Sequence, residues 1–163
     1  MDSFALWLES TAMSRAVTYY SWIWPMCETL HFAGLALLIG NVGLLDLRML
    51  GAAKQLPLAP LTRLVRWGVL GFVINLFTGI VFFVGAPSQY VNNIAFQYKL
   101  LFIVLAGANL AVFNLSGVAR TVGVLGPGDD APASAKIIAA TSLFLWVGVM
   151  FWGRMLPFIG NAF

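Results

Sequence analysis

Four apolar stretches, each close to the length of a membrane span, dominate this chain of 163 residues. They run over about 24–45, 67–84, 94–115 and 137–156. A helix needs about 20 consecutive apolar residues to cross the hydrocarbon core of a bilayer. Because the connections between the stretches are short, the sequence predicts an all-α integral membrane protein. We expect a single domain over 1–163 that folds as an up-down four-helix bundle.

The amino-acid composition is not that of a water-soluble domain, because too few side chains are charged to cover a surface that faces water. Hydrophobic residues make up 61% of the chain and charged residues only 9%, whereas a soluble domain carries about 25% charged residues. The nine Lys and Arg residues are scattered over the predicted loops, which argues against a nucleic-acid-binding surface. The single cysteine, Cys27, excludes a disulfide framework and a zinc site built from cysteines within one chain.

The N-terminal segment is expected to lie along the membrane surface. The first four residues contain an acidic side chain and no basic one, so a cleavable signal peptide is not predicted. Apolar side chains at Phe4, Trp7, Leu8 and Ala12 recur at helical spacing. This pattern predicts one amphipathic helix in the membrane interface over about 3–16.

The distribution of basic residues predicts the orientation of the bundle. Six of the nine basic residues fall in the first and third connections: Arg48, Lys54, Arg63, Arg66, Arg120 and Lys136. Since cytoplasmic loops are enriched in Lys and Arg, that side is expected to face the cytoplasm. Both termini are then expected on the outer side of the membrane.

A polar cluster lies within the first predicted span, where apolar residues are expected. Glu28 and His31 are three residues apart and share a helix face, and His31 is the only histidine. At 1.5 Å per residue, His31 lies roughly 9 Å below the start of the span. Lys99 and Arg154 lie at a similar depth in the third and fourth spans. Because ionisable residues inside a membrane are usually functional, these four side chains predict an outward-facing pocket.

Further polar residues are expected in the bundle interior. Amides and a hydroxyl on three spans predict a polar network below the pocket, formed by Asn41, Asn75, Thr78 and Asn109. At the inner end of the first span, Asp46 and Arg48 are expected to cap the membrane surface or to form an ion pair with a neighbouring loop.

Several short motifs along the chain resemble those of a bacterial membrane-protein family. They are Glu28–Leu35, Asp46–Gly51, Asn75–Gly79, Phe96–Lys99 and the pair Gly153-Arg154. Together they resemble a family of small four-helix bacterial inner-membrane proteins of uncharacterised function. The resemblance implies a multi-pass protein of the bacterial inner membrane, and it implies no activity.

One hypothesis for the polar pocket is the binding of haem b. His31 would be an axial ligand, because neutral imidazole suits iron. Gly34, one turn further along, would leave room for the macrocycle, and Lys99 and Arg154 would pair with the propionates. A second axial ligand would come from one of these sources: Met26, Met150, Met155, His31 of a second copy, or a partner subunit. A five-coordinate haem is the other option.

Three other hypotheses stay open. In a pathway for protons, ions or small solutes, Glu28 and His31 would exchange protons. A copper site would use Met26, Cys27 and His31, whose soft and borderline ligands favour copper over zinc. Alternatively, the polar residues fix the helix register of an accessory subunit, in a homo-oligomer or a larger membrane complex. No catalytic set is recognisable, so we do not expect an enzyme that acts by itself.

Overall fold

The computed structural model describes residues 3–159 and confirms the all-α fold, with no β-strand in that range. Four helices are long and apolar enough to cross a membrane: α3 (Ile23–Met49), α4 (Leu58–Gly85), α6 (Ile94–Leu115) and α8 (Ala133–Met155). Four short helices complete the chain: α1 (Ser3–Glu9), α2 (Ala12–Tyr19), α5 (Pro87–Val91) and α7 (Val118–Gly123). The protein is therefore a multi-pass membrane protein.

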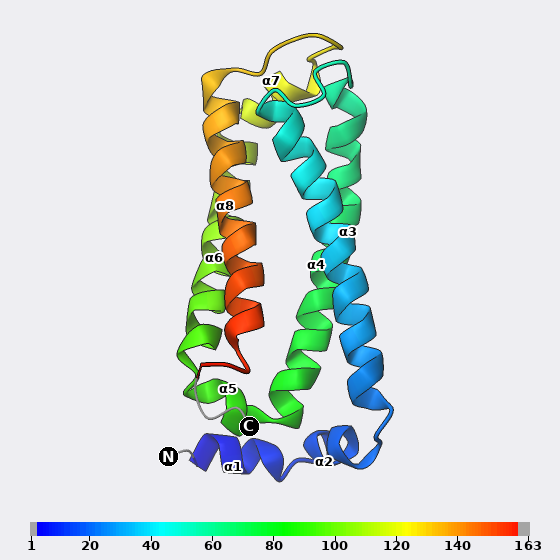
Figure 1. The fold of residues 1–163 in the computed structure, drawn as a ribbon, viewed down its shortest axis with the longest axis vertical. Helices are drawn as coiled ribbons and strands as arrows, with labels where there is room; N and C mark the ends of the chain where they lie inside the picture. Colours follow the sequence, from blue (N-terminus) through cyan, green and yellow to red (C-terminus); the bar gives the residue numbers. More distant parts are fainter. Residues whose placement is uncertain (1–2, 160–163) are drawn as a thin grey trace.

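The long helices form two pairs that run along the same axis (Figure 1). In one pair α3 packs on α4, in the other α6 packs on α8, and α3 also contacts α8. α1 and α2 lie across one end of the bundle, and α7 lies at the opposite end (Figure 1). We refer to these as the α1 end and the α7 end.

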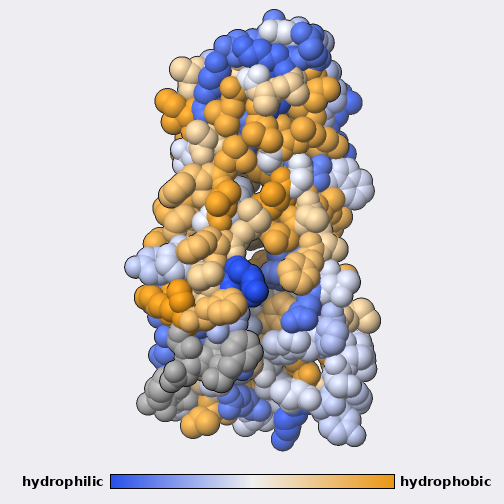
Figure 2. Space-filling model, in the orientation of Figure 1, coloured by the Kyte–Doolittle hydropathy of each residue, from blue (hydrophilic) through white to orange (hydrophobic). Residues whose placement is uncertain are grey.

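The surface of the bundle matches a membrane environment. Figure 2 shows apolar side chains over the middle of one face and hydrophilic ones concentrated at the α7 end. Some strongly hydrophilic side chains also interrupt the apolar surface toward the α1 end (Figure 2). Large side chains such as Phe77, Val104 and Phe144 point outward from the long helices and are more than half exposed. Lipid is the solvent that such a surface requires.

The observed helix boundaries confirm one predicted span closely and correct two others. The third span matches its prediction, whereas α4 begins at Leu58 rather than near 67 and α8 begins at Ala133 rather than near 137. The connection between the first two spans is thus shorter than predicted, and it covers 50–57. Pro60 lies in the first turn of α4, where backbone N–H groups have no partner within the helix, so its missing N–H removes no hydrogen bond.

The N-terminal segment forms two helices instead of the single one predicted over 3–16. The hydroxyls of Ser10 and Thr11 donate hydrogen bonds to the carbonyls of Trp7 (2.6 Å) and Leu8 (2.7 Å), which end α1. The Thr11 hydroxyl then accepts from the amide of Ser14 (3.2 Å) and caps the start of α2. Side chains that bond the local backbone in this way compete with a continuous helix.

Glycines let α3 and α4 approach closely where they cross. A Cβ atom on Gly71 would lie 2.5 Å from the carbonyl oxygen of Gly34 and 2.7 Å from the amide nitrogen of Leu38. A Cβ atom on Gly68 would meet Val42 at 3.1 Å. Close backbone contact at small residues is a common way for helices to associate within a membrane. The crossing therefore depends on the absence of side chains at these positions.

We expect Gly71→Ala to lower the free energy of unfolding by about 1–3 kcal/mol, the usual range for overpacking. The added methyl group would collide with backbone atoms of α3, which have little freedom to move. Gly79→Ala is the matched control, because a Cβ atom there meets nothing within 4 Å. Unfolding followed by circular dichroism in detergent measures both. Equal stabilities of the two variants would contradict a tight crossing.

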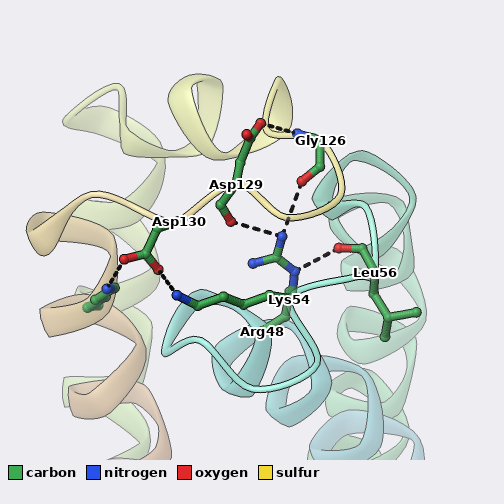
Figure 3. A network of polar contacts seen from close by, with 7 residues as sticks. Arg48, Lys54, Leu56, Gly126, Asp129 and Asp130 are labelled. Atoms are coloured by element: carbon green, nitrogen blue, oxygen red, sulfur yellow. Dashed lines mark hydrogen bonds and ion pairs between the residues drawn. The ribbon is translucent and has the colours of Figure 1, made fainter.

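A buried arginine ties two loops together at the α7 end (Figure 3). Arg48 is 1% exposed, and its Nε donates to the carbonyl of Leu56 at 2.7 Å. Its Nη2 donates to the carbonyls of Gly126 (3.2 Å) and Asp129 (3.1 Å). Arg48 thus contacts two neighbouring loops, and the partners of its Nε and Nη2 are backbone carbonyls. Asp46, two residues earlier, points to a different side of α3 from Arg48, because residues two apart do not share a helix face.

An exposed carboxylate joins the same loops to α8. Asp130 lies 3.1 Å from Lys54 Nζ and 2.7 Å from Lys136 Nζ. Figure 3 shows the pair that Asp130 forms with Lys54. Hydrogen bonds from Lys136 and Lys54 hold the pKa of Asp130 below its ordinary value. The charged carboxylate therefore stabilises the fold at pH values above the ordinary aspartate pKa. This stabilisation is lost as the pH falls through the lowered pKa of Asp130.

We expect Asp130→Asn to lower the unfolding temperature slightly at pH 7 and to have a smaller effect below about pH 4, where Asp130 of the unfolded wild-type chain begins to be protonated. Thermal unfolding of both proteins at pH 7 and pH 3 measures the difference. About 1 M salt should reduce the effect at pH 7, since it shortens the Debye length to about 3 Å. A difference that is independent of pH and salt would show that the ion pairs contribute nothing.

Candidate functional site

His31 is held against α4 by a side-chain hydrogen bond. Its Nδ1 lies 2.7 Å from Thr78 Oγ1, and Thr78 is fully buried. The carbonyl of Ile74, 2.8 Å from Thr78 Oγ1, is an acceptor for the single hydroxyl hydrogen. When that hydrogen goes to the backbone, the hydroxyl oxygen accepts a hydrogen bond from His31 Nδ1. In the neutral imidazole this tautomer leaves Nε2 with a free lone pair.

The free nitrogen of His31 is available to a ligand. Nε2 has no hydrogen-bond partner within residues 3–159. The ring of Phe82 packs beside the imidazole, with 5.6 Å between the ring centroids. Histidines that bind metals typically donate their other ring N–H to a fixed acceptor, which orients the ring. His31 and Thr78 have this arrangement.

Lys99 reaches the same region from the other helix pair. Its ammonium group interacts electrostatically with His31, and its Nζ lies 3.6 Å from where a Cβ atom of Gly153 would be. The missing side chain of Gly153 on α8 thus makes room for the end of the lysine. No carboxylate forms an ion pair with Lys99 in the described part of the chain. The charges of His31 on α3 and Lys99 on α6 thus act on one another at a distance, and no hydrogen bond joins the two side chains within residues 3–159.

Glu28 and Arg154 have separate partners, so the predicted four-residue cluster is looser than expected. Glu28 is exposed and its Oε1 accepts a hydrogen bond from Trp24 Nε1 at 3.2 Å. Burial, with a contribution from nearby Glu28, raises the pKa of the Tyr90 hydroxyl on α5. Arg154 is exposed, and its guanidinium carbon lies 4.9 Å from the centroid of the Phe158 ring.

Gly34 does not provide space for a macrocycle, which corrects that expectation. A Cβ atom at Gly34 would lie 2.7 Å from Asn75 Nδ2 and 2.9 Å from the carbonyl oxygen of Gly71. The room beside Gly34 is thus filled by α4. This glycine serves the helix crossing, and a flat cofactor near His31 would have to lie on another side of the imidazole.

The three predicted copper ligands do not share one environment. Met26 is 51% exposed, whereas Cys27 is buried against Val17 and Val81. Residues 3–159 contain no group of three or more His, Cys, Asp or Glu side chains that could hold a metal ion. The arrangement therefore gives the copper hypothesis no additional support.

The predicted interior network is divided into separate hydrogen bonds. Asn41 Nδ2 donates to the carbonyl of Leu37 at 2.6 Å, and Asn75 Nδ2 donates to that of Gly71 at 2.9 Å, both within their own helices. Asn109 Nδ2 donates across to the carbonyl of Ile138 on α8 at 3.1 Å. Asn109 thus joins two helices, while Asn75 keeps a buried Oδ1 atom without a partner among the described residues.

Asp46 lies inside the bundle, which corrects the expectation that it caps the membrane surface or pairs with a loop. This residue is 3% exposed, and its Oδ2 has no hydrogen-bond partner in the part of the chain that the structure describes. The spacing of Leu38, Val42, Asp46 and Met49 places all four on one helical stripe, which is the signal that could have identified it. Its closeness to the end of the span suggested a surface position instead.

Comparisons of the chain with protein-family models, curated proteins and solved structures find no match. The site must therefore be interpreted from its own chemistry. That chemistry consists of an oriented imidazole with a free nitrogen and a nearby lysine without a carboxylate partner, both within the predicted membrane thickness.

We expect Thr78→Val to remove the fixed tautomer of His31 while preserving the shape of the buried side chain. Without the hydroxyl acceptor, the imidazole hydrogen will distribute between Nδ1 and Nε2. The ¹⁵N chemical shifts of the His31 ring in the purified protein report the tautomer directly. Thr141→Val, at an exposed position on α8, is the matched control. Unchanged ring shifts in Thr78→Val would show that the hydrogen bond does not set the tautomer.

Proposed function

We propose that this protein is a cofactor-binding subunit of the bacterial inner membrane, in which His31 Nε2 is an axial ligand of haem b. The observation that carries the proposal is the 2.7 Å contact between His31 Nδ1 and Thr78 Oγ1, which orients the ring and keeps Nε2 on the side away from Thr78. When bound, haem would supply one-electron transfer. The residues of this chain would hold the ligand nitrogen and the charges around it.

The environment of Lys99 supports an anionic ligand. A lysine within a membrane-spanning helix normally pairs with an opposite charge, and no such pair is found for it within residues 3–159. A haem propionate would provide that charge through a strong charge-assisted hydrogen bond. Arg154 near the same end offers a second cation.

One chain offers one histidine, so a six-coordinate haem requires another ligand. Met150 and Met155 on α8 are partly buried and lie in the α1 half of the helix, whereas Met26 is half-exposed. A second copy or a partner subunit is the other source, and we therefore propose a homo-oligomer or a larger membrane complex. In this proposal the α1 end and the haem face the outer side of the membrane, and the excess of basic residues at the α7 end supports that orientation.

The absorption spectrum of the full-length protein, purified in detergent after expression with excess haem, tests the proposal. We expect a Soret band that His31→Ala removes and Thr78→Val weakens, with about 10- to 100-fold lower haem affinity. Lys99→Met should also lower affinity, and Lys99→Arg should restore much of it. Thr141→Val should bind haem like the wild type. A colourless wild-type protein, or a band that survives in His31→Ala, would overturn the proposal.

A proton pathway is the second candidate, because Asn75, whose backbone carbonyl contacts the Thr78 hydroxyl, has a buried Oδ1 without a partner in the described part of the chain. A water molecule at this amide would extend the polar chain inward from His31, since buried waters bridge unsatisfied polar groups. Proton flux into liposomes that is lost in both His31→Ala and Glu28→Gln, from a colourless protein, would favour this function. A protein without colour or flux would instead fit an accessory subunit.

A further inference from the structure

The half of the bundle nearer α7 contains a second site, separate from His31. A cavity of about 240 Å³ lies between the long helices, and all four contribute to its wall. Most of the wall is apolar, and Phe72, Phe113 and Trp146 are its aromatic members. Its polar members are Asp46, Asn109 and Ser142. His31, Thr78 and Lys99 do not line it, so this space is independent of the proposed haem site.

Asp46 presents an unsatisfied carboxylate oxygen at this cavity. Oδ2 is buried and has no hydrogen-bond partner among residues 3–159. The hydroxyl of Ser142 on α8 is the polar group that interacts with the carboxyl. The nearest basic residue in sequence, Arg48, directs its Nε and Nη2 to backbone carbonyls of the loops, and its buried Nη1 has no hydrogen-bond partner among residues 3–159. Burial of a carboxylate without a cation is costly. A positively charged group in the cavity would therefore offset this cost.

The other polar groups of the cavity can also accept hydrogen bonds. Asn109 donates one of its two Nδ2 hydrogens to the carbonyl of Ile138, and its side-chain oxygen stays available as an acceptor. The Ser142 oxygen can also accept. Together with Asp46 Oδ2, these atoms number three, and a primary ammonium group carries three N–H donors. The lining of the cavity therefore complements an ammonium group in both charge and hydrogen bonding.

The remaining wall indicates what the ammonium group is attached to. The rings of Phe72 and Trp146 lie 6.5 Å apart between centroids and meet edge to face, and aromatic rings attract cations as well as apolar groups. The volume of about 240 Å³ equals roughly eight water molecules at about 30 Å³ each. This space is too small for a drug-sized molecule, since such ligands occupy about 300–1,000 Å³.

We propose that this cavity binds a small apolar primary amine, with its ammonium group on Asp46 and its apolar body against Phe72 and Trp146. The carboxylate supplies the charge that distinguishes the amine from a neutral molecule of the same shape. The apolar wall selects against strongly hydrated cations, which would lose their water shell without replacement.

Benzylammonium and benzyl alcohol form a matched pair of probes that differ mainly in charge. Isothermal titration of the full-length protein in detergent should show saturable binding of benzylammonium and at least 10-fold weaker binding of benzyl alcohol. Asp46→Asn should lower benzylammonium affinity at least 10-fold and leave benzyl alcohol binding unchanged. Equal binding of benzylammonium by the wild type and Asp46→Asn, or no saturable binding by the wild type, would overturn the proposal.

A second pair of variants tests the cavity without altering the carboxylate. Ala106 is buried and lines the cavity, so Ala106→Leu should fill it and abolish benzylammonium binding. Ala108 is exposed on the same helix and lies outside the lining, so Ala108→Leu should bind like the wild type. Thermal unfolding confirms that each variant is folded, and this pair decides the matter if Asp46→Asn does not fold. Wild-type affinity in a folded Ala106→Leu would also overturn the proposal.

Discussion

The direct backbone contact between α3 and α4 is the constraint on which both candidate sites depend. Gly34 faces Gly71 across the crossing, and this fixes the register of two antiparallel helices. His31 lies one turn before Gly34, and Thr78 lies two turns after Gly71. This register brings the two side chains within hydrogen-bond distance. The same register places Asp46 beside the cavity further along α3. A shift of one residue along either helix would separate His31 from its acceptor.

The two helix pairs provide different halves of each site. α3 and α4 hold the imidazole, whereas α6 and α8 position Lys99, whose amino group rests against Gly153. The Asp46 cavity is likewise enclosed by side chains from both pairs. Ligand sites between the helices of a bundle are common, because facing helices converge there while their backbones stay fully hydrogen-bonded. In this chain both candidate sites lie in the interior, and contacts of Arg48 and Asp130 hold the loops at the α7 end.

Hydropathy and helical spacing predict most of the fold and only part of the site. Span lengths follow from the bilayer, so the long helices could be located, and His31 could be singled out as an ionisable residue within one. The role of Gly34 could not be predicted, because it depends on which residue of α4 faces it. Asp46 was overlooked because distance from the span end indicates depth poorly when the helix continues to Met49. The break at Ser10 and Thr11 required side-chain hydrogen bonds that hydropathy does not describe.

The loop contacts of Arg48 have a consequence for the order in which the chain assembles. Its carbonyl partners at Gly126 and Asp129 follow it by 78 and 81 residues, after α6 and before α8. During synthesis, Arg48 therefore reaches the membrane surface long before these carbonyls exist. The guanidinium can complete its hydrogen bonds only after the third helix has been inserted and the following loop has turned back. Closure of the α7 end thus marks a late stage of biogenesis, when the two helix pairs are joined.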